Sequence, residues 1–200
     1  KINWKKLFKI FGWLVLAGVL FVVGIFIYYA KDLPSSDNIS ARTVIESTKI
    51  YDRTGEHLLY EVHGEEKRTQ IPYSEMSEAI RYATIALEDQ DFYNHRGIKL
   101  SAIMRAVFKD VVNMGKAQGG STITQQLVKK TMLTDEKTLS RKIKEVILSL
   151  ELEQKFEKDE IMHMYLNTIP YGSNAYGIEA AAQTYFEKNA KDLTLDEAAL

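Results

Sequence analysis

The longest apolar run in the chain covers residues 10–30, which carry no charge and are rich in Leu, Val, Ile and Phe. A helix of this length, at about 1.5 Å per residue, is about 30 Å long and matches the hydrocarbon core of a bilayer. The pattern therefore predicts a single transmembrane helix over residues 10–30, preceded by a tail of residues 1–9. The alternative is a buried helix of a soluble domain.

Lysines and aromatic residues around this run predict its orientation. Lysines precede the run at positions 1, 5, 6 and 9, and Trp and Tyr lie towards both of its ends. Because lysine favours the cytoplasmic side and aromatic rings favour the two interfaces, we expect a cytoplasmic N-terminus and an extracytoplasmic chain after Lys31. A cleaved signal peptide would have a shorter apolar region and a small-residue cleavage site, and neither is evident.

A strand pattern follows a short linker. Residues 49–52 and 58–62 flank a glycine-containing turn and predict a hairpin, and residues 67–71 are a candidate third strand. Together these segments predict a linker and a small β pedestal over residues 31–71, with no evident chemistry of its own.

From residue 72 onward, apolar residues recur at the three- and four-residue spacing of amphipathic helices. One helix is expected from an N-cap at Ser74 to Glu88, and a second begins near Leu100. The stripe from Leu100 to Val112 predicts core packing, with shallow contact to lipid as the alternative.

Further helices are expected towards the C-terminus. One starts at Thr134 or Asp135, one covers residues 158–167, and one begins at the capping box of Thr194 and Glu197. The first of these three has a stripe of apolar residues that we expect to be buried. The stripe consists of Leu139, Ile143, Val146, Ile147 and Leu150.

An acidic cluster ends the helix that leads to residue 88. Glu88, Asp89 and Asp91 lie close together and are followed by Phe92 and His95. The helix dipole disfavours negative charge at a helix C-terminus, so the cluster calls for an explanation. It is either a solvated helix end or a site where one carboxylate acts as a general base beside apolar walls.

A basic run lies between residues 129 and 144, where six cations face two anions in a chain of net charge −1. The run is either a solvated face, with Glu145 as the helical partner of Arg141, or a clamp for phosphate or pyrophosphate. A glycine turn before Thr122 favours the clamp, because a helix N-terminus presents free N–H groups to an anion. The six cations are Lys129, Lys130, Lys137, Arg141, Lys142 and Lys144.

Composition narrows the chemistry further. The chain has 200 residues, no cysteine and four histidines, and these histidines form no HExxH pair. A disulfide framework and a thiolate metal site are therefore excluded, and a zinc site is disfavoured. The near-neutral net charge predicts no bulk attraction to nucleic acid.

Four segments of the chain share the residues and spacing of known motifs. They are Glu88-Asp89-x-x-Phe92-x-x-His95-x-Gly97, Gly119-Gly120-Ser121-Thr122-Ile123-Thr124-Gln125-Gln126, Arg141-Lys142-x-x-Glu145 and Lys158-x-x-Ile161-x-x-x-Tyr165-Leu166-Asn167. In this order they resemble the motifs of the family 51 peptidoglycan glycosyltransferases, found in class A penicillin-binding proteins and monofunctional transglycosylases.

The resemblance implies a mainly α, lysozyme-like, two-lobed glycosyltransferase domain over residues 72–200. The fifth motif of the family lies further downstream, so we expect this domain to be incomplete at its C-terminus. An anchor followed by a β segment resembles the bifunctional penicillin-binding proteins more than the monofunctional enzymes.

The resemblance also implies an activity. The family polymerises lipid II into β-1,4-linked glycan strands, with inversion at the anomeric carbon and release of undecaprenyl pyrophosphate, on the outer side of the bacterial cytoplasmic membrane. It assigns the general base to Glu88 and a second essential carboxylate to Glu145. Lys137 stands where the family usually has Arg, and a lysine lacks the bidentate geometry of a guanidinium.

Further residues of the first three motifs and of the basic run are implied to bind substrate. They are Asp89, Phe92, His95, Gly120, Ser121, Thr122, Thr124, Gln125, Gln126, Lys129, Lys137, Arg141, Lys142 and Lys144. The sequence requires no cofactor, and the family implies a divalent cation, Mg or Mn, as a candidate near the pyrophosphate. Expected partners are lipid II, the growing glycan strand, membrane lipids and other proteins of cell-wall synthesis and division.

Several alternatives stay open at the level of the sequence. Asp89 either positions Glu88 or binds substrate, and His95 either caps its loop or handles protons. Tyr165 and Asn167 favour a role in supporting the fold. A lysozyme-like hydrolase and a non-catalytic scaffold are the competing functions, but neither accounts for the anchor together with the two carboxylates and the basic run.

Overall fold

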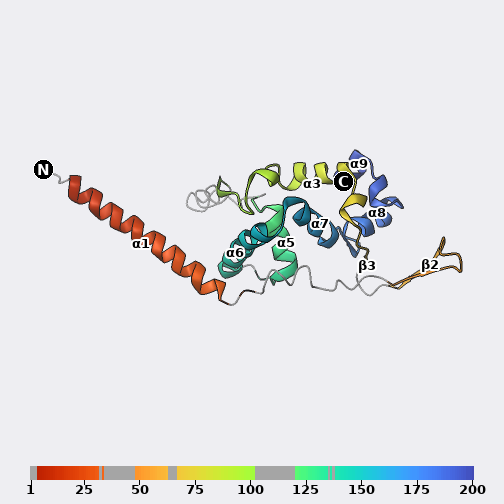
Figure 1. Cartoon of the computed structure of the whole chain (residues 1–200), viewed down its shortest axis with the longest axis horizontal. Coiled ribbons are helices and arrows are strands. Elements are labelled where there is room, and N and C mark those ends of the chain that lie inside the picture. Colours follow the sequence, from red (N-terminus) through yellow and green to blue (C-terminus); the bar gives the residue numbers. More distant parts are fainter. Residues whose placement is uncertain are drawn as a thin grey trace.

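The computed structural model describes residues 4–31, 33, 48–62, 67–101, 120–134, 136 and 138–200. These residues are mainly helical, as predicted for a lysozyme-like domain (Figure 1). The α-helices are α1 Trp4–Ala30, α3 Glu78–Glu88, α5 Ile123–Met132, α6 Leu139–Lys155, α7 Lys158–Thr168, α8 Ile178–Phe186 and α9 Leu195–Ala199. Short 3-10 turns are η1 Tyr73–Glu75, η2 Phe92–Asn94 and η3 Ala190–Asp192.

Helix α1 extends away from the helical body, and its C-terminal end lies beside α6 (Figure 1). Within the described part of the chain, it is the one helix long and apolar enough to cross a membrane, and none of its residues is buried. An exposed apolar surface of this size would be unfavourable in water, so the structure supports the interpretation of α1 as a membrane anchor. It begins at Trp4, earlier than predicted, so Lys5, Lys6 and Lys9 of the predicted tail lie within the helix.

The hairpin predicted after the linker is confirmed. Strand β1 Thr48–Tyr51 pairs antiparallel with β2 Leu58–Val62. The third strand is placed differently, because β3 Lys67–Arg68 pairs in parallel with β4 Ala175–Tyr176 instead of extending the hairpin. The guanidinium of Arg68 lies 4.3 Å from the centre of the Tyr176 ring, which helps to hold this segment against the helical body.

Two predicted helix starts were wrong by a few residues. Helix α3 begins after Ser77, whose side chain accepts a hydrogen bond from the Ile80 N–H, and Ser74 lies in the preceding 3-10 turn. Helix α6 begins after Thr138, not at Thr134 or Asp135. Each region contains several residues able to cap a helix, and the sequence pattern alone does not select among them. The capping box that begins α9 is confirmed.

Helices α5, α6 and α7 pack against one another and form the centre of the core. The buried face of α6 was predicted wrongly. Leu139 is 80% exposed and the rest of the predicted stripe is only partly buried. The buried face instead carries Glu145, Leu148, Ser149 and Leu152, because this side of α6 packs on α5 and, at Ser149, on Gly97 of the loop after α3. In the stripe predicted from residue 100, Leu100 is 69% exposed, and the rest lies outside the described residues.

Candidate active site

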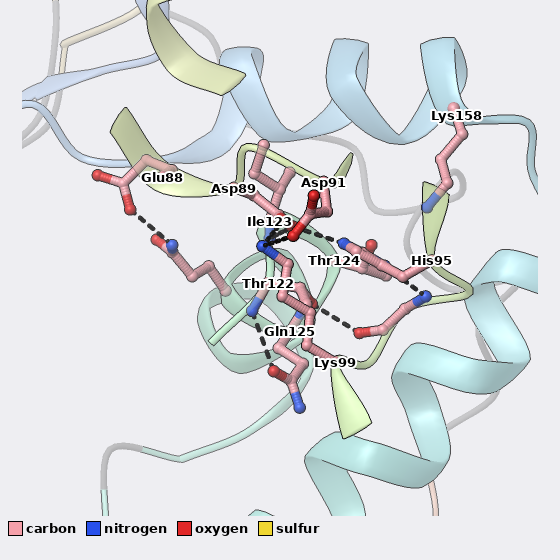
Figure 2. A network of polar contacts seen from close by, with 12 residues as sticks. Glu88, Asp89, Asp91, His95, Lys99, Thr122, Ile123, Thr124, Gln125 and Lys158 are labelled. Atoms are coloured by element: carbon pink, nitrogen blue, oxygen red, sulfur yellow. Dashed lines mark hydrogen bonds and ion pairs between the residues drawn. The ribbon is translucent and has the colours of Figure 1, made fainter. Parts of the chain in front are cut away.

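The loop that follows α3 is fixed by the carboxylate of Asp89. This side chain is fully buried and accepts a hydrogen bond from the Ile123 N–H at 3.0 Å, at the N-terminus of α5 (Figure 2). It also contacts His95 Nε2 at 2.9 Å and forms an ion pair with Lys99 Nζ at 2.7 Å. All of these partners belong to the protein, so they favour a positioning role for Asp89.

Lys99 was missed by the sequence analysis, since no motif includes it. Burial is the largest single influence and lowers the pKa of its ammonium group, but the hydrogen bonds and negative charges of Asp89 and Asp91 together raise it more, so the pKa lies above its ordinary value of 10.5. The ammonium group is therefore positively charged at neutral pH and neutralises the buried Asp89 carboxylate. Its second carboxylate partner, Asp91, lies 3.4 Å away and is largely exposed.

His95 closes the same loop. Its Nδ1 accepts a hydrogen bond from the Gly97 N–H at 3.1 Å, so the ring proton lies on Nε2 and is donated to Asp89. Phe92 is fully buried, with Lys158 Nζ 4.5 Å from the centre of its ring. These contacts favour the interpretation of His95 as a loop cap, and they place Phe92 in the core.

Most polar side chains at the N-terminus of α5 form hydrogen bonds within the protein. Thr122 and Gln125 form a capping box, and the Thr122 hydroxyl also donates to the Gly97 carbonyl at 2.6 Å. Thr124 donates to Glu153, which pairs with Lys158. Thr122, Thr124 and Gln125, all predicted to bind substrate, are thus buried and hydrogen-bonded to the chain itself.

Gln126 faces a different side of α5 and contacts Glu88. Its Nε2 donates to Glu88 Oε2 at 2.8 Å, and its Oε1 accepts a hydrogen bond from the Tyr165 hydroxyl at 3.1 Å. The Glu88 side chain is exposed at the end of α3 (Figure 2). The structure therefore brings together residues from α3, α5 and α7 around one accessible carboxylate.

Glu88 opens onto a cavity of about 360 Å³. Lys129 and Lys130 contribute two cations to its lining, while Leu87 and Tyr171 contribute apolar surface. Burial raises the pKa of Tyr171, so its hydroxyl stays protonated. Thr84, Gln126, Tyr165, Ile169, Pro170 and the end of α9 complete the lining. Lys130 and Tyr171 were not among the predicted site residues.

Glu145 belongs to a second cluster, which does not line this cavity. It is buried on α6 between the guanidinium of Arg141, with Nη1 3.4 Å from Oε2, and the ammonium group of Lys142. Lys142 Nζ also lies 3.3 Å from the hydroxyl of Ser121, just before α5. Glu145 is thus the i+4 partner of Arg141, as one interpretation of the sequence had it, but it is buried and not part of a solvated face.

The other predicted site residues are distributed around these two clusters. Gly120 and Ser121 are exposed before α5, and Lys144 is partly buried on α6. Lys137 and Gly119 lie outside the described residues. Within the described ranges, no three His, Asp and Glu side chains form a group that could hold a metal ion.

Asn167 supports the fold, as the sequence favoured. Its side-chain amide accepts a hydrogen bond from the Ile71 N–H at 3.1 Å and donates to the Ile71 carbonyl at 2.9 Å. These two bonds join the end of α7 to the segment that leads into η1. Tyr165 is also buried, but its hydroxyl belongs to the site.

An apolar anchor helix and a mainly helical domain with an accessible carboxylate beside lysines define a membrane-anchored enzyme domain. The family model described as Transglycosylase matches residues 55–200, so the chain belongs to the transglycosylase family. Among curated proteins, the chain is similar to penicillin-binding protein 1A of Rickettsia bellii, at 41% identity over 98% of this chain and 25% of that protein.

Two further relatives are similar to this chain at a comparable level of identity. Penicillin-binding protein 1F of Bacillus subtilis is 41% identical over 100% of this chain and 28% of its own length. Penicillin-binding protein 1A of Aquifex aeolicus is 45% identical over 85% of this chain and 23% of its own length. The chain thus spans about a quarter of the length of the curated relatives it matches.

Proposed function

We propose that this chain is the glycosyltransferase portion of a bifunctional class A penicillin-binding protein. Its activity is the polymerisation of lipid II into β-1,4-linked glycan strands for the bacterial cell wall. The observation that carries the proposal is the accessible Glu88 carboxylate, held by Gln126 at a cavity lined with lysines. The membership of the transglycosylase family supports the same reaction class.

Glu88 is the general base in this proposal. It takes the proton from the 4-hydroxyl of the incoming lipid II while that oxygen attacks the anomeric carbon of the growing strand. The bond from this carbon to the pyrophosphate oxygen breaks, and attack from the opposite face converts the α-linkage into a β-linkage. The proton ends on Glu88, and undecaprenyl pyrophosphate leaves.

The leaving pyrophosphate needs stabilisation of negative charge more than it needs a proton. Lys129 and Lys130 line the Glu88 cavity and are the candidates for this role. Glu145 is paired with Arg141 and Lys142, so we assign to it the orientation of these cations rather than proton transfer. A divalent cation that shields the pyrophosphate would supplement these charges.

The proposed location follows from the anchor and the substrate. The N-terminus is cytoplasmic and the catalytic domain lies on the extracytoplasmic side, where polyprenyl-linked substrate is held in the same bilayer. The lysines before the apolar run support this orientation. Membrane lipids, the growing strand and other proteins of cell-wall synthesis and division are the proposed partners.

Replacement of the base tests the reaction. Glu88→Gln keeps the size of the side chain but cannot accept the proton, so we expect polymerisation of lipid II to fall by about 10²- to 10⁴-fold. Binding of the lipid-linked substrate should survive. The matched control is Glu78→Gln, at the exposed first turn of the same helix, which should keep the wild-type rate.

A Glu88→Gln protein that polymerises lipid II at the wild-type rate would contradict the assignment of the base. Cleavage of mature peptidoglycan by the wild-type protein, without polymer formation, would favour a hydrolase instead. Gel analysis of radiolabelled products distinguishes long glycan from cleavage fragments.

A further inference from the structure

The hydroxyl of Tyr165 is the buried end of a hydrogen-bonded path that reaches Glu88. Tyr165 lies on α7 and is 2% exposed. Its hydroxyl is 3.1 Å from Gln126 Oε1, and Gln126 Nε2 is 2.8 Å from Glu88 Oε2. The path therefore runs from a core helix, through one amide on α5, to the carboxylate at the end of α3.

The chemistry of the three groups fixes the direction of this path. A side-chain amide has an accepting oxygen and a donating nitrogen, and a carboxylate only accepts. Because Gln126 Oε1 accepts the hydrogen bond from the Tyr165 hydroxyl, the amide nitrogen must face Glu88. Burial, followed by the negative charges of Glu88 and Asp89, raises the pKa of Tyr165, so its hydroxyl stays protonated at neutral pH.

We propose that Tyr165 is a positioning residue for the base: by donating to Gln126, it holds the amide that in turn holds Glu88 Oε2 and leaves Oε1 to take the acceptor proton. The inference rests on the proposed function and adds a residue to its mechanism. Tyr165 does not touch the reacting atoms in this scheme. Its effect passes through Gln126, and chains of hydrogen bonds strengthen one another.

The same tyrosine also supports the fold, and the two roles belong to different parts of the side chain. The ring packs among the buried residues of α5 and α7. The hydroxyl contacts Gln126. Tyr165→Phe keeps the ring and removes only the hydroxyl, so it separates a contribution to catalysis from a contribution to packing.

The test is a double-mutant cycle on the full-length protein, with steady-state polymerisation of lipid II in detergent. Tyr165→Phe should lower kcat about 5- to 30-fold and leave KM within about twofold, because a positioning residue acts on the transition state. In a Gln126→Ala background, the same substitution should change kcat by less than about twofold, since the path is already broken.

The pH profile gives an independent readout. Gln126 donates to the charged form of the base, so removing Tyr165 or Gln126 should move the acidic limb of the kcat/KM profile to higher pH. Tyr93→Phe is the matched control, because it removes one tyrosine hydroxyl hydrogen bond, to Asp159, on the exposed side of the loop. Its profile should coincide with that of the wild type.

If Tyr165→Phe lowers kcat by the same factor in the wild-type and Gln126→Ala backgrounds, the proposal is overturned. A Tyr165→Phe protein with wild-type kcat and pH profile would also overturn it. If Tyr165→Phe does not fold, Gln126→Glu replaces it: a carboxylate at 126 still accepts from Tyr165 but does not donate to Glu88. Wild-type kcat in Gln126→Glu would overturn the proposal. A wild-type rate in Glu88→Gln would instead refute the assignment of the base, and cleavage of mature peptidoglycan without polymer formation would refute the proposed function itself.

Discussion

At the scale of single residues, the buried carboxylate of Asp89 links the loop after α3 to the N-terminus of α5. It contacts Lys99 and His95 in its own loop and the backbone N–H of Ile123 on α5. Asp89→Asn removes the charge and leaves Lys99 without its buried partner. We expect a loss of about 2–4 kcal/mol in the free energy of unfolding, because removing one partner of a buried ion pair leaves the other charge uncompensated. Denaturant titration measures it.

The control for this prediction is Asp91→Asn. Asp91 is the second carboxylate near Lys99, but its side chain is 67% exposed, so its loss should change stability by less than about 0.5 kcal/mol. Equal effects of the two substitutions would contradict the central role of Asp89.

The Lys99 ammonium also gives the domain a pH dependence at high pH. Its pKa in the folded protein is raised above the ordinary value of 10.5. The stability that it contributes is therefore fully present below pH 10.5 and is lost as pH rises through the raised value. The wild type should lose more free energy of unfolding above this pH than Lys99→Met does. Identical pH dependence in both proteins would refute the contribution.

At the scale of elements, the loop after α3 lies directly against the backbone of α6 at Gly97. Gly97 has a φ of +81°, and a Cβ atom there would lie 2.7 Å from the carbonyl oxygen of Ser149 on α6. Only glycine therefore allows this loop to lie directly on the helix backbone.

Gly97→Ala should destabilise the helical domain by about 3 kcal/mol or more, since it combines an unfavourable φ with a backbone clash. Gly55 is a matched control, because its φ is +78° but nothing lies within 4 Å of an added Cβ. Gly55→Ala should leave the thermal transition of the helical domain within about 2 °C of the wild type. Similar melting temperatures for the two variants would show that the contact with α6 is unimportant.

Cations of the basic run lie on two different helices and belong to two different clusters. Lys129 and Lys130 on α5 line the Glu88 cavity, whereas Arg141 and Lys142 on α6 surround Glu145. The sequence suggested one clamp. The structure instead assigns part of the positive charge to the cavity and part to the compensation of a buried carboxylate.

At the scale of the whole molecule, α1 stands apart as an apolar helix with no buried residue (Figure 1). Tethering the domain to the bilayer raises its effective concentration towards a substrate held in the same bilayer. Removal of residues 1–31 should leave polymerisation in detergent unchanged. On liposomes at low enzyme concentration, the rate should fall by about tenfold or more. Equal rates of the two forms on liposomes would show that the anchor contributes nothing to turnover.

The sequence by itself determined much of the local structure. The uncharged run predicted the anchor helix, and the turn between strand-forming residues predicted the hairpin. The helical spacing of apolar residues predicted α3 up to Glu88. The capping box of Thr194 and Glu197 involves residues three apart, so its signal is complete within one turn of chain. The four motifs likewise indicated the family that the family model confirms.

Only the tertiary structure decided which polar residues face the cavity. Thr122, Thr124 and Gln125 stand beside Gln126 in one motif, yet the first three are buried and hydrogen-bonded within the protein while Gln126 holds Glu88. The pairing of β3 with β4, the burial of Glu145 and the partners of Lys99 were equally beyond the sequence. The first two depend on contacts between segments far apart along the chain, and periodicity specifies a helix face but not the neighbour that covers it. The partners of Lys99 lie in an irregular loop, where no period predicts which side chains meet.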